Sequence, residues 1–176
     1  MFYNRESRVE CETEDLNEKE MAGELSMDII RFERSYILMK NIEDLVPKNK
    51  FDDSGIEELR MLSDEEIAPI LPALLEWMKD MNWPIAKEMP ELLSKHPKVL
   101  VPCIIEVLQP EQSECDWKNF IIWVLLPKLD KKYLVMLKPC LERIANNPAQ
   151  SEIFEETDEA AREFLQENGW YIDKDD

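Results

Sequence analysis

The chain has 176 residues, of which 44% are hydrophobic, and it carries a formal net charge of −18 at pH 7. This length favours one globular unit with an attached extension, and the apolar content is sufficient for a buried core. The charge disfavours binding to nucleic acid or to an anionic membrane, because both are polyanions. The 3 glycines beside 11 prolines favour a helical fold over a β fold rich in tight turns.

The N-terminal segment is predicted to contain an arm and one helix. Residues 1–17 are polar and acidic without a hydrophobic period, so we expect a flexible arm. Residues 18–41 place apolar side chains at steps of three and four, as one face of an amphipathic helix requires. These side chains are Met21, Ala22, Leu25, Ile29, Phe32, Tyr36 and Met39. The start lacks the pattern of a signal peptide, and no apolar run is long enough for a membrane span, so we expect a cytoplasmic protein with reduced thiols.

Residues 42–170 contain a series of apolar, helix-like runs. At Ser63 the sequence has the S-x-x-E form of a capping box, which predicts the start of a strongly periodic helix that reaches Met78. The stretch "DMNWPIA" then predicts a tight corner between antiparallel helices, with Asn82 as the N-cap and Pro84 in the first turn. Further helices are predicted in "HPKVLVPCIIEVLQP", "CDWKNFIIWVLLPKL", "DKKYLVMLKPCLERIANNP" and "TDEAAREFLQENG". Residues 171–176 are expected to form a frayed tail.

A repeated motif predicts how these helices pack. "PALLE" at Pro72, "PCIIE" at Pro102 and "PCLER" at Pro139 align with one another. Each proline lies inside a helical run and should kink it, because proline removes a backbone N–H and crowds the preceding turn. A second helix follows each motif. The pattern predicts an all-α domain, a short right-handed α-solenoid of HEAT-like helical hairpins preceded by the N-terminal amphipathic helix.

Four segments carry a resemblance to a known family. "NIEDLVPKNKFDD", "LLEWMKDMNWPIA", "CDWKNFIIWVLLPKL" and "LERIANNP" resemble the bacterial family called domain of unknown function 5071, across residues 42–166. The D-x-N-W-P and D-W-K segments are the most specific parts of this resemblance. It implies a compact HEAT-like helical domain, and it brings no assigned activity and no catalytic residues. Residues 1–40 lie outside the usual pattern of the family.

Two corners of the predicted array combine carboxylates with tryptophan. Equivalent loops of stacked hairpins project along one edge, so five residues could share a polar-aromatic binding surface. They are Asp80, Asn82, Trp83, Asp116 and Trp117. In the alternative interpretation, the aspartates and the asparagine cap helices while the tryptophans pack between repeats. The residue types favour this alternative, since tryptophan is most often largely buried.

Lys48 and Lys50 form a small basic cluster in "VPKNK". The simplest interpretation is a solvated turn in which the two lysines offset the charges of Asp52 and Asp53. The alternative is a contact with a phosphate or with an acidic peptide.

The sequence predicts no catalytic residue, no metal site and no cofactor. The single histidine, His96, stands in "SKHPK", which reads as a solvated loop between helices. The cysteines match no zinc motif, and we expect free, buried thiols. The buried thiols are those of Cys103, Cys115 and Cys140, which lie in apolar surroundings, whereas Cys11 belongs to the polar arm. Neither a G-x-S-x-G motif nor a glycine-rich phosphate loop is present.

The leading hypothesis is therefore a non-catalytic protein-interaction module whose acidic surface binds a protein partner. In its sharpest form the partner is basic, as expected for an immunity-type or antitoxin-like inhibitor whose charge steers association. One alternative is a HEAT-like enzyme that acts on nucleic acid or on a small molecule through the Asp/Trp corner residues. Another is a structural protein that forms a homo-oligomer through residues 18–40.

Overall fold

The computed structural model describes residues 42–112 and 114–170, and these residues form helices and turns without a β-strand. The predicted all-α class is confirmed. The predicted arm at 1–17, the helix at 18–41 and the tail at 171–176 lie outside the described residues, and so does the proposed oligomer contact. In the described part, no helix is long and apolar enough to cross a membrane.

The described α-helices include all those predicted from Ser63 onwards. They are α2 (Ile56–Arg60), α3 (Asp64–Ile67), α4 (Leu71–Leu75), α5 (Met89–Leu93), α6 (Pro97–Val107), α7 (Cys115–Phe120), α8 (Lys131–Asn146), α9 (Gln150–Phe154) and α10 (Thr157–Glu167). Short 3₁₀ segments are Ile42–Leu45, Ala68–Ile70, Glu76–Lys79, Ile85–Lys87 and Leu126–Lys128, and Ile121–Leu125 is π-helical. Helix α9 was not predicted, because five residues are too few to show a helical period.

The three motif prolines do not act alike. The run from Asp64 to Lys79 is divided into α3, a 3₁₀ segment, α4 and a second 3₁₀ segment, and Pro69 and Pro72 each stand near the start of one of these pieces. Both prolines lack the N–H that a continuous α-helix would use. In contrast, α6 and α8 continue through Pro102 and Pro139. The sequence thus locates the helical runs correctly, whereas it does not show which proline interrupts the α-helix.

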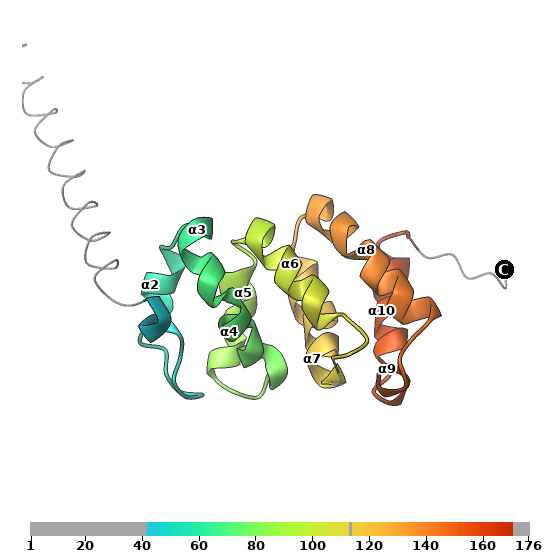
Figure 1. Cartoon of the computed structure of the whole chain (residues 1–176), viewed down its shortest axis with the longest axis horizontal. Coiled ribbons are helices and arrows are strands. Elements are labelled where there is room, and N and C mark those ends of the chain that lie inside the picture. Colours follow the sequence, from blue (N-terminus) through green and yellow to red (C-terminus); the bar gives the residue numbers. More distant parts are fainter. Residues whose placement is uncertain (1–41, 113, 171–176) are drawn as a thin grey trace, which may run out of the picture. The chain divides into compact units, whose positions relative to one another are not determined.

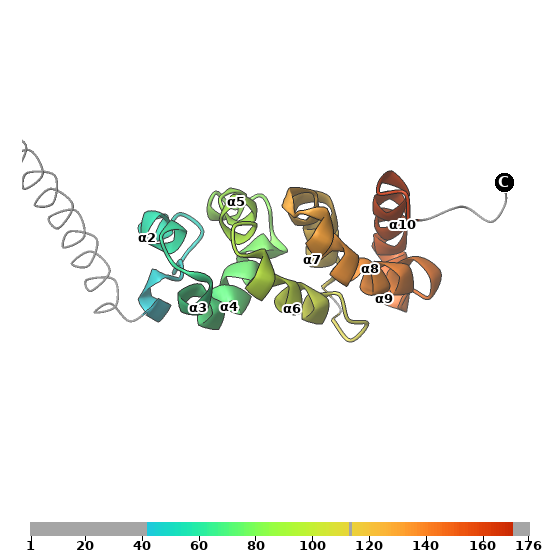
Figure 2. The same ribbon diagram turned by 90° about the horizontal axis from the view of Figure 1, so that it is seen from above.

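Successive helices of residues 42–170 pack against one another (Figure 1). Helix α8 contacts both α6 and α10, while α7 contacts α10 and the 3₁₀ segment Glu76–Lys79. Seen from above, α5, α7 and α10 lie on one side of the unit and α4, α6 and α8 on the other (Figure 2). This pairing agrees with stacked helical hairpins, and the right-handed HEAT-like solenoid stays a prediction.

The periodic apolar positions form the core. The periodic apolar side chains of residues 63–78 are at most 3% exposed; they are Ile67, Ile70, Leu71, Leu74, Leu75 and Met78. Burying one such side chain stabilises the fold by about 1.5–3 kcal/mol relative to leaving it in water. The predicted capping box is also present, since the Glu66 N–H donates to Ser63 Oγ and the Ser63 N–H donates to Glu66 Oε2.

His96 is buried, which corrects the prediction of a solvated loop residue. Its side chain lies at the start of α6, it is 5% exposed, and its Nδ1 is 2.8 Å from Asp64 Oδ1 at the start of α3. The contact ties together the beginnings of two helices. The local sequence "SKHPK" could not reveal it, because the partner stands 32 residues earlier in the chain.

Replacing His96 by alanine should therefore lower the free energy of unfolding by about 1–2 kcal/mol, through the lost contact with Asp64 and the lost packing. Urea denaturation followed by far-UV circular dichroism measures the change. Lys95→Ala is the control, because Lys95 is exposed and adjacent. An equal effect of both substitutions would contradict a stabilising role for His96.

Candidate functional site

The structure brings four of the five predicted binding residues to one pocket. This pocket has a volume of about 390 Å³. Its lining residues are Lys79, Asp80, Trp83, Glu114, Asp116, Trp117 and Glu155, and we call it the acid–aromatic pocket. Four carboxylates, two indole rings and one ammonium group thus meet at the ends of segments that are distant in sequence. The fifth predicted residue, Asn82, is exposed and does not line the pocket.

Asn82 does not act as the predicted N-cap. Instead, its backbone N–H and its Nδ2 both donate to Asp80 Oδ1, at 2.9 and 3.0 Å. The Trp83 N–H donates to the backbone oxygen of Asp80 at 3.1 Å, which closes the turn. Pro84 then occupies the N-cap position of the 3₁₀ segment Ile85–Lys87. An aspartate commonly accepts from the backbone two residues later, and here this local bond outcompetes capping by Asn82.

Both tryptophans of the pocket also have packing roles. Trp117 is 6% exposed, and its Nε1–H donates to the backbone oxygen of Leu75 at 3.1 Å. Trp83 is half-buried and meets the Trp77 ring edge-on, with centroids 5.5 Å apart. Aromatic pairs favour this arrangement, and a buried indole N–H needs an acceptor. Part of each tryptophan ring therefore packs against the protein, as the packing interpretation expects. Another part of each ring faces the pocket.

The pocket already holds one cation against an aromatic face. Lys79 Nζ is 4.7 Å from the centroid of the Trp117 ring, which is within the range of a cation–π contact. The same Nζ is 2.9 Å from Glu114 Oε2 and 3.8 Å from Glu76 Oε1. The ammonium group of Lys79 is thus bound by an aromatic ring and by carboxylates. The other walls of the pocket consist of the same kinds of group.

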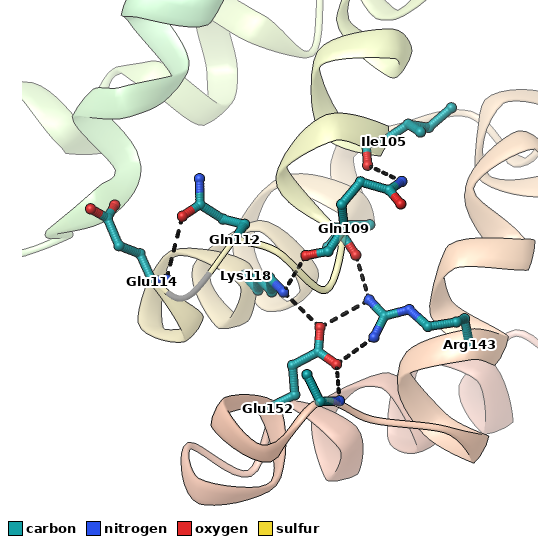
Figure 3. Close-up of polar contacts among 9 residues, drawn as sticks. Ile105, Gln109, Gln112, Glu114, Lys118, Arg143 and Glu152 are labelled. Atoms are coloured by element: carbon teal, nitrogen blue, oxygen red, sulfur yellow. Dashed lines mark hydrogen bonds and ion pairs between the residues drawn. The ribbon is translucent and has the colours of Figure 1, made fainter.

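A buried ion network connects side chains of α7, α8 and α9 (Figure 3). Lys118 on α7 and Glu152 on α9 are both 0% exposed, and Lys118 Nζ lies 2.6 Å from Glu152 Oε1. Arg143 on α8 bonds both oxygens of the same carboxylate. The Ala149 N–H donates to Glu152 Oε2 at 2.7 Å. One carboxylate therefore joins three helices.

The cations of this network also bind the end of α6. Lys118 Nζ donates to the backbone oxygen of Gln109 at 2.7 Å, and Arg143 Nη2 donates to that of Leu108 at 2.5 Å. These carbonyls belong to the turn that leads towards Glu114. On the other side, Asn119 Nδ2 donates to the backbone oxygen of Glu155 at 2.9 Å. The backbone of one of the four pocket carboxylate residues, Glu155, is thus held directly by α7.

The pKa of Glu152 is lowered from its ordinary value. Burial acts to raise this pKa, but the hydrogen bonds from Arg143, Lys118 and the Ala149 N–H outweigh burial because they favour the charged form. The carboxylate is therefore ionised at neutral pH, with its charge compensated by the two cations. The local sequence does not indicate this network, because Lys118 and Glu152 are 34 residues apart and the acidic run around Glu152 is typical of a solvent-facing segment.

The thiols of Cys103 and Cys140 are poor nucleophiles. Burial raises the pKa of Cys103, with a further contribution from Glu106, and burial also raises the pKa of Cys140. A raised pKa keeps a thiol protonated at neutral pH. Both side chains are half-buried and free, rather than fully buried as predicted. Among the described residues, no group of three or more His, Cys, Asp or Glu side chains is arranged to hold a metal ion.

Lys48 and Lys50 lie apart from the pocket, in an exposed turn. Lys48 Nζ is 3.6 Å from Asp44 Oδ1, and Lys50 Nζ is 5.3 Å from the centroid of the Phe51 ring. The Lys48 N–H donates to Asp52 Oδ2 at 2.9 Å. Hydrogen bonds from the Ser54 hydroxyl and the Lys48 N–H lower the pKa of Asp52. These contacts agree with a solvated turn, and the anion contact stays a prediction.

One comparison with known proteins yields a family. The family model described as Domain of unknown function (DUF5071) matches residues 45–165, which is more than half of the chain. No curated protein matches the chain. The matched range includes the acid–aromatic pocket and the buried network.

Replacing Glu152 by glutamine should lower the free energy of unfolding by about 3–5 kcal/mol, because two cations would remain without a counter-charge. Urea denaturation measures this loss. Glu159→Gln, on the exposed side of α10, should change stability by less than about 0.5 kcal/mol. The double variant Lys118→Met/Glu152→Gln should recover part of the loss, because it removes one of those cations. A single variant as stable as the control would contradict the role of the network.

The contribution of Glu152 should also depend on pH. Its pKa is lower in the folded chain than in the unfolded chain, so the stabilisation is fully present above the unfolded value of about 4.3 and is lost as pH falls through the folded value. The stability difference between wild type and Glu152→Gln should therefore be constant from pH 7 to about pH 5 and shrink below about pH 4. Urea titrations at each pH test this, and a difference that stays constant to pH 3 would contradict it.

Proposed function

Because the chain belongs to the family described as Domain of unknown function (DUF5071), a name that states no activity, we propose a function from the geometry of the site. The protein is a non-catalytic interaction module that binds a basic protein partner at its acid–aromatic pocket. The convergence of carboxylates and indole rings in this pocket is the observation that supports the proposal.

The walls of the pocket suit a basic side chain. An ammonium or guanidinium group gains from the face of an aromatic ring and from carboxylate oxygens at the same time. The pocket offers two indoles and four carboxylates against one ammonium group. Phosphate groups would be repelled by the same carboxylates, which argues against the alternative of an enzyme acting on nucleic acid.

The charge of the whole chain supports the same kind of partner. A net charge of −18 accelerates encounters with a basic protein and slows those with acidic ones. This property is the one expected of an immunity-type or antitoxin-like inhibitor, and the cytoplasmic location belongs to the same hypothesis. In the described residues, catalytic chemistry has little support, because His96 is buried against Asp64 and the two described free thiols have raised pKa values.

A comparative pull-down from the lysate of the source organism tests the proposal. The pocket variant Asp80→Asn/Asp116→Asn removes two charges while keeping side-chain size. The control Glu65→Gln/Glu159→Gln removes the same number of charges from exposed positions outside the pocket. A basic protein should be retained by wild type and control, and its affinity should fall about tenfold for the pocket variant.

Salt should weaken the same interaction, since exposed charges are screened over about 8–10 Å at physiological ionic strength. Circular dichroism of all three baits shows whether each is folded. Equal retention by the pocket variant and its control would mean that this pocket is not the interface. Retention of acidic proteins by the wild type would contradict the expected partner class.

A further inference from the structure

We propose that the acid–aromatic pocket receives a single basic side chain of the partner, arginine or lysine, in competition with the chain's own Lys79. This inference rests on the proposed function and specifies both the ligand group and the internal competitor that limits its affinity.

Lys79 occupies the position that a ligand cation would take. Its ammonium group lies over the Trp117 ring at 4.7 Å and against Glu114 at 2.9 Å. These are the two kinds of contact that the pocket can offer to an arginine or a lysine from outside. The intramolecular contact is therefore direct evidence that the walls bind a side-chain cation.

Lys79 is also shared by two cavities. Lys79 and Trp117 line both the acid–aromatic pocket and a second pocket of about 180 Å³, which extends between α4 and α6. Withdrawal of the Lys79 side chain would uncover more of the Trp117 ring and would release the exposed carboxylate of Glu114 from its ion pair. Such a withdrawal is feasible, because Lys79 is the last residue of a 3₁₀ segment and its side chain is about a third exposed. A flexible lysine stem can then carry the ammonium group into water.

The rest of the pocket is prepared for a second cation. Within the described residues, the carboxylates of Asp116 and Glu155 form no ion pair, although both line the pocket. The half-buried Trp83 supplies another aromatic wall. A planar guanidinium can stack on an indole and bond two carboxylates together, whereas an ammonium acts as a point charge. An aromatic wall attracts either cation, because the positive charge lies against the electron-rich face of the ring.

The test uses the full chain and small probes of known chemistry. The indole N–H signals of the protein, which has 5 tryptophans, are observed by ¹⁵N NMR and assigned with Trp→Phe variants. The probes are the N-acetyl methylamides of arginine, of lysine and, as the neutral control, of glutamine. The Trp83 and Trp117 signals should move with the arginine and lysine probes and stay in place with the glutamine probe. The larger response of the two identifies the preferred cation.

Removal of the competitor is then compared with a matched loss of charge. Lys79→Met should bind the arginine or lysine probe about threefold to tenfold more tightly than Lys98→Met, because a contact to Trp117 and one to Glu114 no longer have to be broken. Lys98 lies exposed in the first turn of α6 and lines neither pocket. Lys79→Gln, which keeps a polar side chain, serves as the second variant and should also bind more tightly than Lys98→Met.

Each outcome has a separate meaning. Equal affinity of the Lys79 and Lys98 variants would overturn the competition, and weaker binding by the Lys79 variants would show that Lys79 helps to hold the ligand. If neither cationic probe moves the Trp83 and Trp117 signals in any variant, the assigned ligand class is wrong. The pull-down with Asp80→Asn/Asp116→Asn remains a separate test, since a partner can bind the rim through other groups.

Discussion

The carboxylate of Glu152 is the point on which the second half of the domain depends. It is fully buried in an acidic protein, and it binds Lys118, Arg143 and a backbone N–H at once. Removing charged groups from water is costly, and the cost is offset only where the geometry leaves few bonds unmade. Here the two cations also bind the carbonyls that end α6. The network therefore sets the relative positions of four helices, α6 to α9.

The helix positions that this network sets also affect the protein surface at the acid–aromatic pocket. Glu155 follows α9, which carries Glu152, and its backbone oxygen accepts from Asn119 on α7, so the position of this rim carboxylate depends on the same packing of α7 against α9. On the opposite side, the bond from Trp117 to the backbone of Leu75 joins α7 to α4. The groups that stabilise the fold are buried behind the pocket, whereas Asp116 and Glu155 at its rim form no ion pair with described residues. Rim substitutions should for this reason affect binding more than folding.

The two interpretations of the tryptophan corners are compatible in this structure. Trp117 packs between helices and donates its N–H to Leu75, and yet its ring carries Lys79 at the edge of the pocket. A large aromatic side chain can bury one part in the core while another part lines a cavity. The rigidity that packing confers also favours binding, because a ring that is already ordered loses little entropy when a ligand arrives.

Local features of the sequence located most of the helical runs and some of their ends. The apolar period predicted the core positions, the S-x-x-E pattern predicted the capping box at Ser63, and Gly169 ends α10 with a φ of 69°. The proline repeat was enough to expect Asp80, Trp83, Asp116 and Trp117 at one edge. Tertiary structure alone decided that His96 is buried against Asp64, and that Lys118 meets Glu152 from 34 residues away. The physical reason is that local patterns encode backbone conformation and the apolar face, whereas a charged side chain is buried only where distant segments supply its counter-charge.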